Sequence, residues 1–257
     1  MTQQNERVTA GMIVIGDEIL SGRTKDVNIG AVADFCTDLG IDLTEVRVVS
    51  DEMDHIVDAI NALRARYTYV FTSGGIGPTH DDITADAVAA AFGVDLPINA
   101  QARAMLEARW KESGTAPNEA RLRMARIPVG ADLIVNSVSA APGFRIGNVH
   151  VMAGVPVIMR AMLEAIGPTL KGGRKYLSRT IKAGVGEGTI GAPFAALQAE
   201  YPDVKMGSYP QMGTGRATTD LVLRCPDEAR LDEAAEKVLA MVAQAHINAG
   251  IAAPQIG

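Results

Sequence analysis

Apolar and polar residues alternate along the first two thirds of the chain in two repeating patterns. A near-continuous apolar run from Thr9 to Ile15, which ends at Gly16, predicts a strand buried on both faces. Apolar residues then recur at helical spacing between Ile29 and Leu39, and Gly40 follows where a left-handed helix cap is expected. The same patterns predict further strands at 43–49 and 69–73 and further helices at 56–63 and 83–92.

Strands that alternate with helices through short connections predict a parallel-type sheet with helices on both faces, a three-layer α/β fold. Two more helices are predicted at 100–113 and 118–126, and another begins at Pro156 and ends near Ile166. Short strands at 133–136 and 148–152 flank an Ala-Pro-Gly loop.

The last third of the chain has a pattern of its own. Between Gly167 and Lys175 the sequence reads G-P-T-L-K-G-G-R-K, which indicates a helix end followed by a linker. We therefore expect one domain at 1–170 and a second at 171–257. The second domain is predicted to be a small β-α-β-β-α unit, with strands at 176–183, 204–209 and 219–225, a helix at 189–200 and an amphipathic helix from Leu231 to Val242.

Composition limits the functional classes. The 257 residues are 47% hydrophobic with a formal net charge of −6, which is typical of a soluble globular protein. Residues 1–170 carry 14 basic and 21 acidic side chains, and residues 171–257 carry 10 and 9. This balance disfavours a nucleic-acid partner. No apolar run approaches the roughly 20 residues of a membrane helix, so we expect a cytoplasmic protein without a membrane partner.

The histidines and cysteines give few signals. Cys36 and Cys225 stand far apart and without metal-ligand spacing, which favours reduced, buried thiols. Three histidines, His55, His150 and His246, are expected to be structural or exposed. His80 either assists proton transfer at a site or is a simple turn residue.

Candidate chemistry lies in the turns after the predicted strands, because ligands of open parallel sheets bind beyond the carboxyl ends of the strands. The first turn is G-D-E-I-L-S-G, from Gly16 to Gly22, and the second is V-S-D-E, from Val49 to Glu52. The third is S-G-G-I-G-P-T-H-D-D-I-T, from Ser73 to Thr84, and the last is A-G-V-P, from Ala153 to Pro156. Glycines and carboxylates are concentrated in these turns.

The third turn suits a phosphate group. Gly74, Gly75 and Gly77 let backbone N–H groups approach an anion, and a helix begins just after them. Thr79, Asp81 and Asp82 precede that helix, where a carboxylate either caps free N–H groups or holds a divalent cation. No lysine follows the glycines, and the loop is not G-x-G-x-x-G, so P-loop ATPases and dinucleotide-dependent oxidoreductases are disfavoured.

A G-x-G-x-x-G sequence does occur in the second domain, at Gly186, Gly188 and Gly191. No acidic residue ends the strand that follows, and the domain is too short for a complete dinucleotide fold. We therefore expect no nucleotide site there.

Four motifs in order resemble one known fold: G-D-E-I-L-S-G, T-S-G-G-I-G-P-T-H-D-D-I-T, A-P-G-F at 141–144 and G-V-P at 154–156. They resemble the MoaB/Mog molybdopterin-binding fold and, within it, the amino-terminal domain of the CinA family. The resemblance covers residues 8–170. The second domain resembles the KH-like segment that follows in CinA proteins. The resemblance implies metal-dependent hydrolysis of ADP-ribose and related nucleotide diphosphates, and it extends to a module of some FAD synthases linked to FAD hydrolysis.

The resemblance also implies roles for individual residues. Asp82 and Asp51 match the functional acids of the pterin-adenylylating relatives, and Asp81 is a further catalytic candidate. Asp17 and Glu18 of the G-D-E motif, with Asp82, are the expected metal ligands. The expected phosphate or nucleotide contacts are Gly16, Asn28, Ser73, Gly74, Gly75, Gly77, Thr79, Gly154 and Pro156.

The function expected from the sequence is hydrolysis of a P–O–P bond in a nucleotide diphosphate, as in an ADP-ribose pyrophosphatase. Hard oxygen ligands favour Mg²⁺ or Mn²⁺, with Co²⁺ as an alternative. The alternative function is molybdopterin binding or adenylyl transfer in molybdenum cofactor biosynthesis, with a pterin phosphate as ligand. A nucleic-acid or scaffold role for the second domain is disfavoured by charge. We expect a homodimer or homotrimer, and no deamidase activity because the sequence ends before the deamidase domain of longer relatives.

Overall fold

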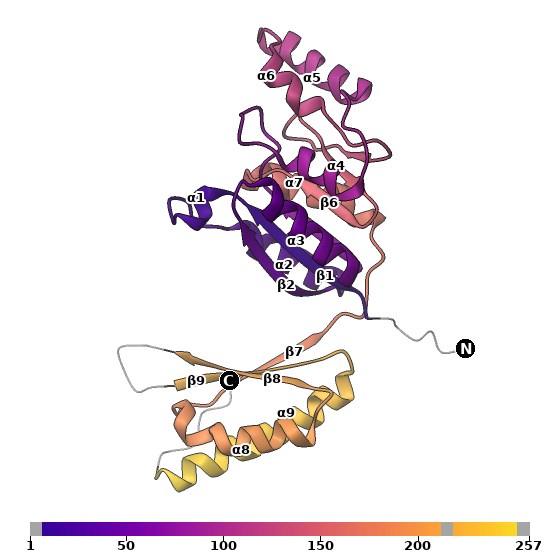
Figure 1. Ribbon diagram of the computed structural model, residues 1–257. Helices are drawn as coiled ribbons and strands as arrows, with labels where there is room; N and C mark the ends of the chain where they lie inside the picture. Colours follow the sequence, from indigo (N-terminus) through magenta and orange to yellow (C-terminus); the bar gives the residue numbers. More distant parts are fainter. Residues whose placement is uncertain (1–6, 212–217, 251–257) are drawn as a thin grey trace, which may run out of the picture. The chain divides into compact units, whose positions relative to one another are not determined.

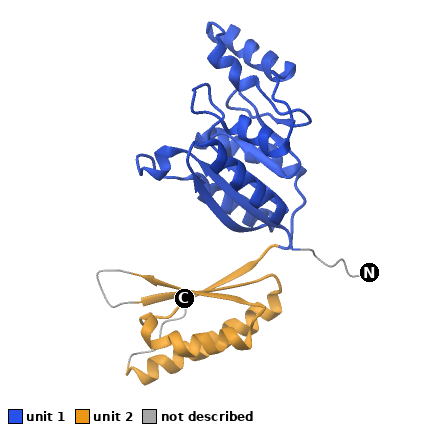
Figure 2. Cartoon of the chain, viewed as in Figure 1, with its two compact units in different colours: residues 1–174 blue, residues 175–257 orange. Residues whose placement is uncertain are grey.

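The structure is a computed structural model that describes residues 7–211 and 218–250. The chain divides into two compact units, residues 1–174 and 175–257, which Figure 2 shows in different colours. The division falls four residues after the boundary placed at 170 from the sequence. Each unit has its own hydrophobic core and is described by itself.

The first unit alternates strands with helices (Figure 1). Its amino-terminal half contains β1 (Thr9–Ile15), α1 (Asp17–Leu20), α2 (Asn28–Leu39), β2 (Asp42–Val49), α3 (Met53–Arg66), β3 (Tyr69–Ser73) and α4 (Thr84–Phe92). Its second half contains α5 (Ala100–Ser113), α6 (Glu119–Leu122), the 3₁₀ helix η1 (Arg123–Ala125), β4 (Asp132–Ile134), β5 (Gly143–Ile146), β6 (Val149–Met152), α7 (Pro156–Ile166) and the 3₁₀ helix η2 (Gly167–Thr169).

One sheet runs through this unit in the order β2-β1-β3-β6-β5-β4. The pairs β1–β2, β1–β3 and β3–β6 are parallel, so the carboxyl ends of β1, β2, β3 and β6 lie along one edge. Residues alternate between the two faces of the sheet. On one face Ile13 and Ile15 pack with α3 and α4, and on the other Met12 and Val14 pack with α2 and α7.

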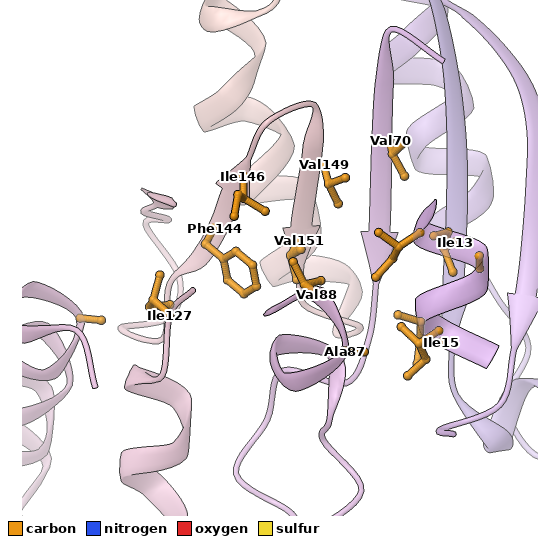
Figure 3. Close-up of a cluster of buried hydrophobic side chains, with 14 of the residues drawn as sticks. Ile13, Ile15, Val70, Ala87, Val88, Ile127, Phe144, Ile146, Val149 and Val151 are labelled. Carbon is orange, nitrogen blue, oxygen red and sulfur yellow. The ribbon is translucent and has the colours of Figure 1, made fainter. Parts of the chain in front are cut away.

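Figure 3 shows the first of these two cores, in which side chains from β1, β3, β5 and β6 meet Ala87 and Val88 of α4. Val70, Ala87, Val88, Val149 and Val151 have no exposed surface. Burial of such valine side chains contributes about 1.5–3 kcal/mol each relative to exposure. The predicted three-layer α/β fold is confirmed, and its core fixes the strand ends that carry the candidate site.

The structure corrects the prediction of a parallel-type sheet in one respect, because β4 and β5 are antiparallel additions at one edge. Strand β5 occupies residues 143–146, next to the Ala-Pro-Gly sequence predicted as a loop between two strands. It reaches β6 through the two-residue connection Gly147–Asn148, with Gly147 at φ 56°. A glycine in this position is typical of tight hairpins. Strand β5 has only four residues, directly after Pro142, which is too few to show the alternation that predicts a strand.

The segment between α4 and β4 leaves the sheet and returns to it. Figure 1 shows α5 and α6 standing away from the strands. Backbone hydrogen bonds join the beginning and the end of this segment. The Asn99 N–H donates to Ala125 O at 2.8 Å, and the Ile127 N–H donates to Pro97 O at 3.1 Å. The helix predicted at 118–126 is shorter than expected, because α6 ends at Leu122 and η1 continues the chain. Ala125 and Ile127 are buried in the core, which anchors η1 beside α4.

The second unit consists of β7 (Leu177–Lys182), α8 (Glu187–Glu200), β8 (Lys205–Gln211), β9 (Thr218–Cys225) and α9 (Glu228–Asn248). The strands form an antiparallel sheet in the order β7-β9-β8. Alternate residues of β9, including Leu221 and Leu223, pack against α8 and α9. The order of elements matches the predicted β-α-β-β-α pattern.

Two observations bear on the expectations from composition. Cys36 and Cys225 are both buried free thiols, and burial raises the pKa of Cys36 to about 12. Within residues 7–211 and 218–250, no helix combines the length and apolar character that a membrane crossing requires.

His150 in β6 makes the stability of the first unit depend on pH. The side chain is 1% exposed and contacts the rings of Tyr69 and Phe71. Burial and, secondarily, the charge of Arg145 lower its pKa to about 4. The unfolded chain binds a proton at this position below about pH 6.5, before the folded chain does, so the free energy of unfolding falls as pH drops through this window. The full effect is on the order of 3 kcal/mol.

We therefore expect His150→Phe to lose most of this acid sensitivity, because phenylalanine cannot bind the proton. Urea unfolding at pH values between about 6.5 and 4, followed by fluorescence, measures it. Trp110 is the single tryptophan of the chain and is buried in the first unit, so its signal reports that unit. The exposed His55 gives the control, since His55→Phe should keep the wild-type slope. Equal slopes for His150→Phe and wild type would contradict this account.

Candidate functional site

A cavity lies at the edge of the sheet where the parallel strands end. Its volume is about 570 Å³, and its walls come from the turns after β1, β2, β3 and β6. The predicted site residues lining it are Gly16, Glu18, Asp51, Gly74, Gly75, Gly77, Asp81, Asp82 and Gly154. The structure thus brings together nine predicted residues, eight of them from the four motifs of the resemblance and Asp51 from the turn after β2. Ligands of open α/β sheets bind at this position.

The glycines after β3 are required by close packing as well as by any ligand. A Cβ on Gly74, which has φ 107°, would lie 2.2 Å from the carbonyl oxygen of Ile15. A Cβ on Gly75, at φ 67°, would lie 2.1 Å from the Thr84 hydroxyl. That buried hydroxyl donates to the Gly74 carbonyl at 3.0 Å, and the Thr84 N–H donates to the Gly75 carbonyl at 3.0 Å. The turn is therefore locked between β1 and α4.

This locked turn presents backbone donors to the cavity. Among the described residues, no hydrogen bond is made by the N–H groups of Gly75, Ile76 and Gly77. All three residues line the cavity. Successive N–H groups in such a turn form a concave site that favours anions. The arrangement has the geometry expected of a phosphate cradle.

Asp82 folds back over the turn that carries it. One of its carboxylate oxygens accepts hydrogen bonds from the Thr79 N–H at 2.8 Å and the Thr79 hydroxyl at 2.5 Å. A Cβ on Gly77 would lie 2.6 Å from this carboxylate, so the glycine leaves room for it. Helix α4 has Ile83 at its N-cap without a side-chain hydrogen bond. The alternative that Asp81 or Asp82 caps this helix is therefore wrong.

Asp51 is the centre of a group of carboxylates. It accepts a hydrogen bond from the Asp17 N–H at 2.9 Å, which joins the turns after β1 and β2. Burial raises the pKa of Asp51 above its ordinary value, the Asp17 N–H opposes this shift, and the charges of Asp17, Glu18 and Asp81 raise the pKa further. The charge of Asp51 is thus unfavourable unless a cation offsets it.

A second hollow of about 550 Å³ adjoins the cavity and shares Glu18, Asp51 and Asp81 with it. Asp17 and His80 line this second hollow, whereas Asp82 lines the first. The structure therefore does not gather the three expected metal ligands, Asp17, Glu18 and Asp82, in one wall. His80 is almost fully exposed.

The donor set fits a cation that arrives with phosphate. Within the described part of the chain, no three His, Cys, Asp or Glu side chains are grouped so that they could hold a metal ion by themselves. Magnesium, however, commonly takes one or two carboxylates and completes its shell with water and substrate phosphates. Glu18, Asp51 and Asp81 supply hard oxygen atoms beside the phosphate cradle. These residues fit a site that the substrate completes.

Four predicted contact residues do not line the cavity. Asn28, 5% exposed, donates from Nδ2 to the Ser73 hydroxyl and to the Gly154 carbonyl, both at 2.8 Å. Asn28 and the equally buried Ser73 thus connect α2, β3 and the turn before α7. Thr79 holds Asp82, and Pro156 begins α7. These residues support the walls of the cavity rather than forming them.

Sequence reasoning missed two residues of the wall that comes from η1 and the loop before β5. Met124 and Ser139 line the cavity beside Ala141, which belongs to the A-P-G-F motif. Arg123, next to Met124, donates from Nη2 to the carbonyl of Asp82 at 3.2 Å. A signal was present in the run R-L-R-M-A-R at 121–126, which is a basic cluster within an acidic domain.

The second glycine motif has no comparable setting. Gly186 precedes α8, and a Cβ on Gly188 or Gly191 would meet nothing within 4 Å. Packing therefore does not require glycine at the latter two positions.

Comparisons with known proteins agree with this division of the chain. Residues 11–172 match the family described as a probable molybdopterin binding domain, and residues 175–250 match the middle domain of FAD synthase. A CinA-like protein from Desulfosudis oleivorans is 34% identical over 209 residues, 77% of this chain and 51% of that protein. The chain thus spans about half the length of that relative. A protein from Thermococcus kodakarensis is 32% identical, over 88% of this chain and 94% of its own length.

A solved structure supports the same assignment. The protein CinA from Thermoplasma acidophilum, described as of unknown function, has 36% sequence identity and a TM-score of 0.59, covering 63% of this chain and 98% of its own. These matches confirm the resemblance drawn from the four motifs. The chain therefore belongs to the family described as a probable molybdopterin binding domain and is one of its CinA-like members.

Proposed function

We propose that the first unit hydrolyses the phosphoanhydride bond of nucleotide diphosphates such as ADP-ribose, in a reaction that depends on a divalent metal ion. The observation that supports this most is the composition of one cavity. One cavity of about 570 Å³ is lined by the carboxylates Glu18, Asp51 and Asp81 and by the turn after β3, whose N–H groups at 75–77 make no hydrogen bond among the described residues. This combination suits a ligand that carries several negative charges and brings a cation with it.

In this proposal the turn after β3 holds the phosphates. The N–H groups of Gly75, Ile76 and Gly77 bind phosphate oxygens, because they are preorganised and need no rearrangement. One or two of Glu18, Asp51 and Asp81 would hold Mg²⁺ or Mn²⁺, with Co²⁺ as an alternative, and water and phosphate oxygens would complete the shell of the ion. The bound cation would neutralise phosphate charge and polarise the attacking water. Without it, four carboxylates near one cavity would repel the substrate.

Asp51 is the residue best placed to accept a proton. Its carboxylate lines the cavity and is held by the Asp17 N–H, which orients it to take a proton from the attacking water. The water oxygen forms a bond to phosphorus, and the bridging P–O bond breaks. AMP leaves from one side, and the other phosphate half of the substrate leaves with the bridging oxygen. Asp82, fixed by Thr79, assists by holding the cation or orienting the water.

A second candidate is the binding or adenylylation of a molybdopterin-like pterin phosphate. Two observations favour it: the family match over residues 11–172 and the apolar part of the cavity wall. That wall contains Ile76, Met124, Ala141, Val155 and Ile158, which suit a planar heterocycle. Both candidates place a phosphate on the same turn. We also expect a homodimer or homotrimer, which light scattering would measure.

The proposed reaction can be tested directly with purified protein. Pure protein with Mg²⁺, Mn²⁺ or Co²⁺ should release AMP from at least one of ADP-ribose, FAD and NADH, and chelation should stop the release. Chromatography of the products measures it. FAD belongs in the panel because residues 175–250 match a FAD synthase domain. Absence of AMP from every compound, together with tight molybdopterin binding, would reject the hydrolase in favour of the second candidate.

The second prediction separates the stability of the protein from its activity at Asp51. Asp51→Asn should abolish most AMP release, by about 10²-fold or more, because the proton acceptor and a cation ligand are lost. It should also raise the urea midpoint slightly, since it removes a charge that burial and like charges disfavour, while Asn Oδ1 still accepts from the Asp17 N–H. The exposed Asp58 on α3 gives a matched control, Asp58→Asn. Full activity of Asp51→Asn would show that this residue is not the base.

The third prediction tests the charge of Asp82. Asp82→Asn keeps an acceptor for the Thr79 N–H, so the turn should remain folded, but AMP release should fall about 10²-fold. Asp82→Ala removes both the charge and the acceptor, and it should in addition weaken binding of ADP-ribose. Kinetics with ADP-ribose as the varied substrate distinguish the two effects. If Asp82→Asn retains full metal-dependent activity, the catalytic role of this carboxylate is wrong.

A further inference from the structure

The loop between Gly77 and Asp82 is held from outside at one point. Among the described residues, its internal hydrogen bonds are those between Thr79 and Asp82. Among the described residues, the hydrogen bond that reaches residues 77–82 from another element is the one from Arg123 Nη2 to the Asp82 carbonyl, at 3.2 Å. Arg123 stands 41 residues further along the chain, in η1. A contact between such distant segments fixes the loop relative to the rest of the cavity.

Arg123 lies behind the phosphate cradle. A small hollow of about 20 Å³ is lined by Gly75, Ile76, Gly77 and Asp82 and also by Arg123 and Arg126. The glycine turn is therefore a wall common to this hollow and to the main cavity. Arg123 Nε is buried and, in the part of the chain that the structure describes, has no hydrogen-bond partner. A hollow of this size accommodates about one water molecule.

The positive charge of Arg123 differs in sign from the charged residues that line the main cavity. The main cavity is lined by Glu18, Asp51, Asp81 and Asp82 and by no lysine or arginine among the described residues. Arg126, the other arginine at the small hollow, is ion-paired with the side chain of Asp86 on α4. The Arg123 guanidinium instead contacts a main-chain carbonyl of the loop. Its positive charge therefore acts on the turn through the small hollow, where Arg123 lies beside Gly75, Gly77 and Asp82.

We propose that Arg123 is a positioning residue for phosphate binding. It holds the Asp82 carbonyl, and through it the turn at Gly75–Gly77, in the geometry that binds a nucleoside diphosphate. Its charge also favours an anion on those N–H groups. Met124, the next residue, lines the main cavity, so η1 supports both the loop and the opposite wall of the same site. The phosphate ligand in this inference rests on the proposed function, whereas the support of the loop does not.

The test measures loop order and catalysis separately. In Arg123→Ala, hydrogen exchange of the amides at 75–84 should become faster, because the loop loses its external hydrogen bond. The kcat/KM for ADP-ribose should fall about 10- to 100-fold, as is common when a supporting residue is removed. Added guanidinium ion, well below denaturing concentrations, should restore part of both properties. Arg123→Lys should retain more loop protection than Arg123→Ala, because an ammonium can also donate to the carbonyl.

Arg126→Ala is the matched control, since it removes an arginine from the same segment whose ion-pair partner lies outside residues 77–82. It should leave exchange at 75–84 near the wild-type rate. Unchanged exchange and unchanged kcat/KM in Arg123→Ala would overturn the proposal. So would equal acceleration by both variants across 97–127 and 75–84, which would indicate general loosening. If the wild-type protein hydrolyses no substrate, the proposed function fails, and the exchange experiment still decides the role of Arg123.

Discussion

The site depends on the close approach of backbone segments at the carboxyl end of β3. A side chain at Gly74 would overlap the carbonyl of Ile15 in β1. A Cβ at Gly154, in the turn before α7, would lie 3.2 Å from the Gly74 Cα. The Thr84 hydroxyl and the Asn28 amide add hydrogen bonds to the same point, to Gly74 and Ser73. Three strand ends and the starts of two helices are thereby fixed together.

This rigidity explains how the turn can present unpaired N–H groups to solvent. A flexible turn would change conformation until its N–H groups found hydrogen-bond partners, and it would then no longer form a defined anion site. Here the glycines are held by packing, so the N–H groups of Gly75 and Gly77 keep their directions without a ligand. The same packing brings the turns after β1 and β2 alongside, where the Asp17 N–H binds Asp51. Carboxylates that repel one another are therefore kept near a cradle that attracts anions.

Much of the fold could be predicted from local patterns. Strand β1, helix α2 and the caps at Gly40 and Gly93 follow from apolar periodicity and from the need for positive φ. Strand β5 could not be predicted, because four residues carry too little periodicity and its pairing with β6 is a tertiary contact. In the site, the glycines and carboxylates of the turns line one cavity, but Asn28 and Ser73 are buried supports, since hydrogen bonding between separate elements is invisible in sequence.

The sequence by itself determined the alternation of most strands and helices, the two-part organisation of the chain and the turns in which glycines and acids are concentrated. These features depend on periodicity and on residue types at strand ends, which are local properties. Only the tertiary structure decided that Asp82 folds back onto Thr79 rather than capping α4, and that Arg123 reaches the loop from η1. The reason is physical: hydrogen bonds and like-charge repulsion depend on distances between segments, and folding alone sets those distances.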